Sequence, residues 1–290
     1  MIRLTHGDWT LSMRPEFGAA IASLTWRGHD ILRPAASDAQ APLDMGSFPL
    51  APYANRIDRG RFTFADREVA LPPTPGFEPH ALHGVGWLKS WSVIRTGIDV
   101  VDLALAVEAS PDWPWAWTAS HSLRLDRDGL EMVLAITNQD EAPMPAGLGL
   151  HPYFVVEPET ILMAPAARVW ANGADEIPEQ LVPAAGIMDW SEGESVTSAQ
   201  FVDNAYADWS GHARLVHADH EVRVTASANA RWLQIYAPND AGFVCIEPVT
   251  HRPNAHNAPA DEDAGLVTLA PGQTLSLSMW IDAASIGDHP

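Results

Sequence analysis

The chain has 290 residues, 47% of them apolar, and its 37 acidic residues outnumber its 17 basic residues, giving a formal net charge of -20. Such a negative field repels nucleic-acid phosphates and anionic membrane surfaces, so we expect neither as a partner. The length and the apolar share are sufficient for one large core, and we expect a single domain over residues 1–290.

The first residues, MIRLTHGDWTLSMRPEFGAA, lack the basic start and the apolar run of a signal peptide. No later stretch approaches the roughly 18 uninterrupted apolar residues of a membrane-spanning helix. We therefore expect a cytoplasmic protein. The single cysteine, Cys245, lies in the apolar run F-V-C-I and is expected to be buried, because one cysteine cannot form a disulfide within the chain.

Apolar and polar residues alternate with a period of two in several segments, which is typical of β-strands. Residues 61–71 show this alternation. In residues 115–125 it puts Trp117, Ala119, His121, Leu123 and Leu125 on one face. The D-R-D-G stretch at 126–129 predicts a turn, and the alternation in 130–138 completes a hairpin. Residues 220–228 and 266–281 show the same pattern.

Helical periodicity is not convincing over any ten residues, and the 24 prolines and 20 glycines fall mostly between the alternating runs. Residues 155–200, rich in Ala, Pro, Glu and Ser, are expected to form long connections with short strands. These features predict an all-β fold, a large antiparallel β-sandwich with few short helices. Such a fold leaves a concave sheet face open to a ligand.

Five short stretches place polar or ionisable residues beside glycine, proline or aromatic residues. They are A-N-R-I-D-R-G (54–60), H-A-L-H-G (80–84), G-L-H-P-Y-F (149–154), V-D-N-A-Y (202–206) and C-I-E-P-V-T (245–250). In their order and wording they resemble the motifs of the aldose 1-epimerase (galactose mutarotase) family, from N-R-I-x-x-G-x-F to E-P followed by threonine and asparagine. The resemblance implies the galactose mutarotase-like supersandwich fold.

This resemblance also implies an activity, the interconversion of the α and β anomers of a free aldose. The family uses no cofactor, and its partner is a small monosaccharide. By resemblance, His151 matches the general acid that protonates the ring oxygen, and Glu247 matches the base that takes the C1 hydroxyl proton. Arg56, His83, Asp203 and Asn55 match the residues that hold the sugar; these four positions stand in the motifs quoted above.

Elementary chemistry agrees with this assignment of acid and base. Anomer exchange removes a proton from the C1 hydroxyl and delivers one to the ring oxygen, and histidine and glutamate suit these tasks because burial and neighbours tune their proton affinities. Alternation in F-V-C-I-E-P places Glu247 on the strand face of Phe243 and Cys245. Partial desolvation there raises its affinity for a proton.

Each of these residues also has a structural reading that the sequence leaves open. Glu247 could be an ion-paired residue at a strand end, and His151 a packed histidine. Arg56 could belong to an exposed strand face together with Arg59, Arg61 and Arg67. Asp203, followed by asparagine, could lie in a turn.

The H-x-x-H stretch formed by His80 and His83 is a candidate metal site together with His251 and His256. Residues three apart on a strand point to opposite faces, so joint ligation would need a turn between the two, and we expect no metal. Most of the 12 tryptophans are expected in the core, although one or two could form an apolar platform for a sugar.

Two further functions remain open at this point. A hexose-6-phosphate 1-epimerase would need several converging basic groups, which the arginines near Arg56 could supply. A non-catalytic carbohydrate-binding protein of the same fold would need the sugar-holding residues but not the acid and the base. The presence of both His151 and Glu247 favours an enzyme, an isomerase acting on a free aldose.

Overall fold

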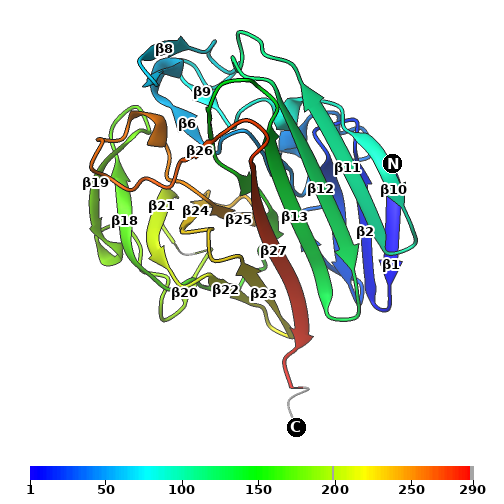
Figure 1. Cartoon of the computed structure of the whole chain (residues 1–290). Helices are drawn as coiled ribbons and strands as arrows, with labels where there is room; N and C mark the ends of the chain where they lie inside the picture. Colours follow the sequence, from blue (N-terminus) through cyan, green and yellow to red (C-terminus); the bar gives the residue numbers. More distant parts are fainter. Residues whose placement is uncertain (198, 288–290) are drawn as a thin grey trace.

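Two large antiparallel β-sheets packed against each other dominate the computed structural model, which describes residues 1–197 and 199–287 (Figure 1). The larger sheet has 12 strands. Ten follow one another in the order β1 (Ile2–His6), β2 (Trp9–Arg14), β3 (Ala20–Trp26), β4 (His29–Leu32), β16 (Tyr153–Val155), β25 (Phe243–Val249), β24 (Trp232–Ala237), β21 (Val202–Trp209), β18 (Ala166–Asn172) and β19 (Pro178–Pro183). The short strands β5 (Pro49–Leu50) and β15 (Gly149–Leu150) pair beside this path.

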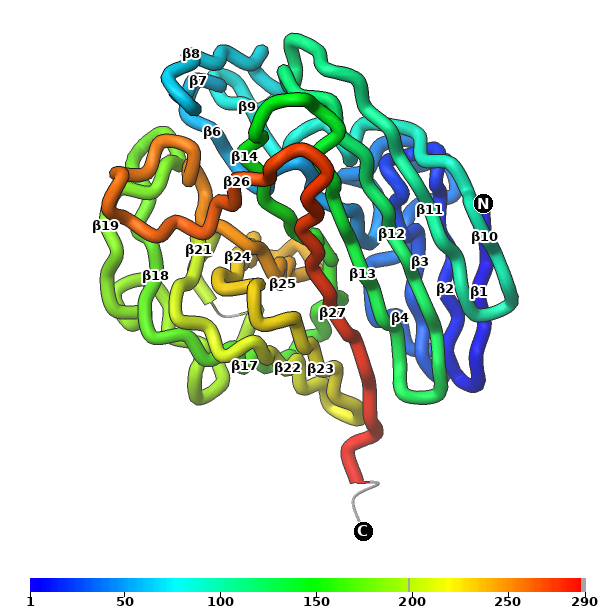
Figure 2. The backbone as a smooth tube through the Cα atoms, viewed as in Figure 1, coloured from blue at the N-terminus to red at the C-terminus, as the bar shows by residue number. Residues whose placement is uncertain are grey.

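The second sheet has nine strands, and its long central strands lie at the front in Figure 1. Its order is β10 (Ser92–Thr96), β11 (Val100–Val107), β12 (Trp117–Leu125), β13 (Gly129–Asn138), β27 (Thr274–Ser285), β23 (His220–Ala226), β22 (His212–Val216), β17 (Ile161–Met163) and β20 (Glu194–Ser195). The backbone trace in Figure 2 shows β1 to β4 running behind β10 to β13.

Small elements complete the described chain. Three strand pairs stand apart from the large sheets: β14 (Met144–Ala146) with β26 (Val267–Leu269), β6 (Arg56–Ile57) with β9 (Ala81–Leu82), and β7 (Arg61–Phe64) with β8 (Arg67–Ala70). The helical segments of the described residues are 3-10 turns of three residues each: η1 (Pro42–Asp44), η2 (Asp58–Gly60), η3 (Gly86–Leu88), η4 (Ala184–Gly186) and η5 (Ala255–Asn257). The predicted all-β sandwich with few short helices is therefore confirmed.

The alternating segments form the strands that their pattern predicts. In β12 each residue of the predicted apolar face is buried, and β12 and β13 pair across the predicted turn. Residues 61–71 fold back on themselves as the β7–β8 hairpin, because Ala65 and Asp66 both have the positive φ of a tight turn. One predicted alternative is wrong: Asp203 lies inside β21, not in a turn.

The same alternation divides the central strands of the larger sheet between two environments. In β25, Val244 and Ile246 are fully buried in the core shared with the second sheet. Their neighbours Phe243, Cys245 and Glu247 point to the opposite face of the sheet. That outer face carries the polar residues described below. Within the described residues no helix is long and apolar enough to cross a membrane.

His121 is a polar side chain buried in the apolar core, and its burial predicts an effect on stability. It is 1% exposed, packs beside Trp91, and neither ring nitrogen has a hydrogen-bond partner in the described chain. Burial lowers its pKa to about 4. The unfolded chain, with a histidine pKa of about 6.5, therefore binds more protons between these values, and stability falls as the pH falls through this window.

We expect His121→Leu to stabilise the protein at pH 7 and to gain roughly a further 2 kcal/mol at pH 5, where the protonation penalty has been removed. Urea unfolding at both pH values measures this difference. His6→Leu is the matched control, since the side chain of His6 is 40% exposed. If the free energy of unfolding of His121→Leu depended on pH as in the wild type, the proposed penalty for protonating buried His121 would be contradicted.

Candidate functional site

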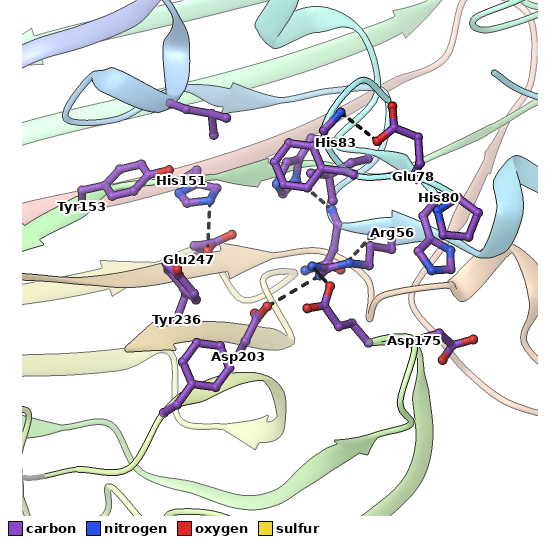
Figure 3. A pocket seen from close by; sticks show the side chains of 18 of the residues that line it. Arg56, Glu78, His80, His83, His151, Tyr153, Asp175, Asp203, Tyr236 and Glu247 are labelled. Atoms are coloured by element: carbon purple, nitrogen blue, oxygen red, sulfur yellow. Dashed lines mark hydrogen bonds and ion pairs between the residues drawn. The ribbon is translucent and has the colours of Figure 1, made fainter. Parts of the chain in front are cut away.

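A cavity of about 780 Å³ opens on the outer face of the larger sheet, a size usual for small-molecule sites. All six residues that the sequence singled out for the site line it: Asn55, Arg56, His83, His151, Asp203 and Glu247. Figure 3 shows five of them directed towards one another from several strands and loops. Segments almost 200 residues apart in the chain therefore meet here.

Strand register fixes the floor of this cavity. In the β24–β25 pair Gln234 lies opposite Glu247, and in the β21–β24 pair Asp203 lies opposite Tyr236. Residues directly opposite in antiparallel strands share a face, so all four side chains are directed to the same side of the sheet. Gln234 Nε2 donates a hydrogen bond to Asp203 Oδ1 (2.6 Å), which orients that carboxylate.

His151 is held by aromatic packing beside Glu247. Its ring stacks on Phe48 and on Tyr153, with ring centroids 4.7 Å apart in both cases. The backbone N–H of His151 donates to the carbonyl of Phe48 (3.0 Å). This arrangement places His151 Nε2 at 3.3 Å from Glu247 Oε1. The two side chains are 8% and 3% exposed, so the pair is shielded from bulk water.

Burial moves the proton affinities of the pair in opposite directions. Desolvation, followed by the nearby negative charge of Asp203, raises the pKa of Glu247 well above its usual value, although Arg56 opposes this. Desolvation lowers the pKa of His151 to about 3, and the cation of Arg33 contributes to the decrease. Both groups are therefore driven towards their uncharged forms, with one proton on the pair.

A charged network surrounds the pair on one side. Arg56 Nη1 lies 3.7 Å from Asp203 Oδ2, and Arg56 Nη2 donates to Glu176. Burial is the largest influence on Asp203 and raises its pKa, while Arg56 and the hydrogen bond from Gln234 oppose this. Arg56 is only 11% exposed, so the alternative in which it belongs to an exposed strand face is wrong.

Residues 54–56 and 82–84, at the ends of the paired strands β6 and β9, bring His83 to the cavity. The backbone N–H of Asn55 donates to His83 Nδ1 (3.0 Å), so the neutral ring carries its proton on Nε2. Desolvation, then the charges of His151 and Arg56, lowers the pKa of His83 well below its usual value. Gly84 follows with a φ of +68°, and a Cβ there would lie 2.4 Å from the carbonyl oxygen of Ala51. The L-H-G stretch thus requires its glycine for close backbone approach.

Several lining residues carry no clear sequence signal. Arg33, which follows β4, lies 3.9 Å above the ring of Tyr153 and donates through Nη2 to the carbonyls of Leu43 (2.6 Å) and Met45 (2.7 Å). None of the twelve tryptophans, all of them in described residues, lines the cavity. Its aromatic walls come from other side chains: Phe77, Tyr153, Phe201, Tyr236 and Phe243.

Other residues that the sequence raised as candidates lie elsewhere or have other partners. Arg59, Arg61 and Arg67 do not line the cavity. His80 Nδ1 accepts a hydrogen bond from the backbone N–H of Arg59 (3.1 Å), whereas His83 Nδ1 accepts one from the backbone N–H of Asn55. These two ring nitrogens are therefore bonded to different backbone groups. Glu247 lies inside β25 and its close ionisable partner is His151, in contrast to a residue paired at a strand end.

The arrangement provides an acid and a base side by side above hydrogen-bonding groups of both kinds. Asp203 accepts hydrogen bonds, Arg56 donates them, and His83 offers an N–H. Aromatic faces of Tyr236 and Phe243 complete the wall. Such a mixture of polar groups and aromatic faces matches a small polyhydroxylated molecule with apolar C–H faces.

Comparison with known proteins points to one family. The sequence profile of the family described as aldose 1-epimerase matches residues 1–282. The uncharacterized protein YphB of Escherichia coli K12 is 31% identical over 95% of this chain and 96% of its own length. A crystal structure from Escherichia coli K12, of a candidate aldose 1-epimerase, has a TM-score of 0.89 at 27% identity and covers 98% of both chains. A galactose mutarotase-like protein from Clostridium acetobutylicum shares the fold, with a TM-score of 0.87 at 21% identity over 98% of this chain and 95% of its own.

The electrostatics of the cavity generate a prediction for the protein without sugar. Asp203→Asn should lower the pKa of Glu247, because it removes a neighbouring negative charge that favours the protonated carboxyl. Infrared spectroscopy over a pH series measures this titration, and Glu247→Gln identifies the carboxyl band that belongs to Glu247. Asp175→Asn, at the exposed mouth of the cavity, makes the same charge change as a control. A Glu247 titration that is unmoved by Asp203→Asn would contradict the assigned cause.

Proposed function

Since the chain belongs to the aldose 1-epimerase family, we propose that it interconverts the α and β anomers of a free, neutral aldose by opening and closing the sugar ring. The observation that carries this proposal is the buried contact of 3.3 Å between His151 Nε2 and Glu247 Oε1. The C1 hydroxyl oxygen and the ring oxygen of an aldose are bonded to the same carbon. An acid and a base that act on both oxygens must therefore lie side by side, as these two groups do.

In this proposal Glu247 takes the proton of the C1 hydroxyl while His151 gives a proton to the ring oxygen. The C1–ring oxygen bond breaks and leaves the open-chain aldehyde. Rotation about the C1–C2 bond exposes the other carbonyl face, and closure returns both protons by the reverse transfers. The pair begins and ends with one proton, so the cycle consumes no cofactor.

The proton must first stand on His151 for this direction of transfer, although burial favours it on Glu247 in the sugar-free cavity. Their contact of 3.3 Å lets the proton pass directly between them. Arg56 and hydrogen bonds from a bound sugar hydroxyl would stabilise the resulting Glu247 carboxylate. Sugar binding and activation of the base are thereby coupled in the proposed mechanism.

The remaining polar residues are proposed to hold the sugar. Asp203, oriented by Gln234, accepts hydrogen bonds from hydroxyl groups, while Arg56 and the Nε2–H of His83 donate to sugar oxygens near the ring. Asn55 fixes the local turn, since its Oδ1 accepts from the N–H of Arg56 (2.7 Å), and it also lines the cavity.

The charges of the cavity favour a neutral sugar over its 6-phosphate. Arg33 and Arg56 are the basic lining residues other than histidine, and Arg56 already pairs with acidic groups. Five carboxyl groups line the same cavity: Glu78, Asp175, Glu176, Asp203 and Glu247. A phosphate dianion needs several unpaired converging donors, so the hexose-6-phosphate alternative ranks second. A binding protein without turnover ranks third, because it has no use for the buried acid–base pair.

We expect Glu247→Gln to lower kcat by about 10²- to 10⁴-fold with little change in sugar affinity, because the amide keeps the size of the side chain but cannot accept the proton. Polarimetry of fresh α-glucose and α-galactose measures turnover, and calorimetry measures binding. His151→Asn should have a similar effect. Because both groups serve one proton exchange, the double variant should be little slower than either single variant.

Asp203→Ala provides the matched contrast in the same cavity, since it should weaken sugar binding through lost hydroxyl contacts. Folded Glu247→Gln protein with near wild-type turnover would exclude Glu247 as the base. If the wild-type protein only matched the spontaneous rate over a broad panel of aldoses while binding them, the binding-protein alternative would replace the enzyme.

The charges of the cavity also predict the preference between a sugar and its 6-phosphate. The protein should use glucose at least as well as glucose 6-phosphate in kcat/KM, and Glu176→Gln should shift this ratio towards the phosphorylated sugar by about three- to tenfold, as expected for one charge at the cavity mouth. Glu192→Gln, a charge change outside the cavity, is the control. A wild-type preference for the 6-phosphate that disappears in Arg33→Gln would reverse the ranking.

A further inference from the structure

Three histidines form a second cluster of ionisable side chains, outside the cavity. His29 begins β4, and His217 and His220 flank the turn between β22 and β23, strands found at the bottom of Figure 2. The ring centroid of His220 is 4.4 Å from that of His29 and 4.3 Å from that of His217. None of the three lines the cavity, and the proposed reaction uses none of them.

Oxygen atoms orient the two buried rings of this cluster. Asp219 Oδ1 lies 2.7 Å from His220 Nδ1, and Thr160 Oγ1 lies 2.9 Å from His217 Nδ1. A carboxylate on Nδ1 fixes the tautomer of the histidine and leaves the lone pair of Nε2 free, as in metal-bound histidines. His220 is 2% exposed, and its Nε2 has no hydrogen-bond partner in the described chain. The ring therefore presents a buried and unused acceptor.

Carboxylates complete the donor set around His220. The ligand atoms of Glu157, His217 and His220 lie within 4.8 Å of one another, and so do those of His29, Asp219 and His220. In the second group Asp219 is already engaged in orienting the ring of His220. In the first group, the unpartnered Nε2 of His220 lies close to the imidazole of His217 and the half-exposed carboxylate of Glu157. Imidazole and carboxylate ligands are those that Zn²⁺ and its neighbours prefer.

The charge of the protein also suits a cation, because its net charge of -20 attracts positive ions.

We propose that His217, His220 and Glu157 bind one divalent transition-metal ion of the Zn²⁺ class, with Asp219 orienting His220. Ligand atoms around tetrahedral zinc lie about 3.3 Å apart, so binding would draw the present groups together by roughly an ångström. Glu157 is 40% exposed and can make this movement. Half-buried His29 packs beside His220 but lies outside the ligand triad.

Calorimetry of chelator-treated full-length protein with Zn²⁺ alone at pH 7.5 tests the proposal, without any sugar. We expect one ion per chain, an affinity that falls with decreasing pH, and Co²⁺ absorption typical of tetrahedral coordination. His220→Phe, which keeps an aromatic ring in the stack, should weaken binding by at least about tenfold, because losing a ligand costs no less than losing an outer-shell partner.

Glu157→Gln is a second variant whose half-exposed side chain allows normal folding, and it should weaken Zn²⁺ binding by a similar factor. His212→Phe, an exposed histidine on the same hairpin, is the matched control and should bind like the wild type. Absence of a 1:1 complex in the wild type, or unchanged affinity in both His220→Phe and Glu157→Gln, would overturn the proposal.

Discussion

The buried contact between a carboxyl group and an imidazole is the interaction on which the rest of the site depends. Both groups would be ionised or partly ionised in water, but burial drives Glu247 and His151 towards their neutral forms. Neutral partners can share a single proton at low cost, whereas a permanently charged pair would need strong compensation. The aromatic rings that press on His151 therefore both position it and set its proton affinity.

The larger sheet makes this contact possible because one of its faces packs in the apolar core and the other carries the polar side chains of the cavity. Alternation along β25 buries Ile246 in the core between the sheets and turns Glu247 to the outer face. The register of β21, β24 and β25 then places Asp203 and Gln234 beside it. A shift of one residue in any of these strands would turn its polar side chains into the apolar core, so the stability of the core also maintains the geometry of the site.

Buried histidines occur in two kinds of surroundings in this protein. His83, His151 and His251 are linked to other polar groups by hydrogen bonds or ion pairs, and they lie near the cavity or the loops that support it. His121 lies among apolar side chains without a partner. The stack around His220 combines both features, since oxygens hold one edge of two rings while a nitrogen remains unused. The oriented rings and the unpartnered nitrogen distinguish the proposed metal site from a histidine that is only packed in the core.

The sequence alone determined the features that depend on local pattern. Period-two alternation predicted β12 and β13 with their turn, and it placed Glu247 on the face of Phe243. Five motifs in order indicated the family and named six residues that the fold gathers in one cavity. The motifs are informative because some backbone positions accept only one residue type. Gly84, after His83, is such a position, so it appears in the sequence at a fixed spacing from the histidine.

Tertiary structure alone decided which distant side chains touch. Neither the 3.3 Å contact of His151 with Glu247 nor the position of Arg33 above Tyr153 follows from spacing, since each joins segments about 100 residues apart. The same holds for the absence of tryptophan among the cavity-lining residues and for the meeting of His29 with His220. Alternation tells which face of a strand a residue occupies, but strand order, register and the packing of loops decide what it meets there.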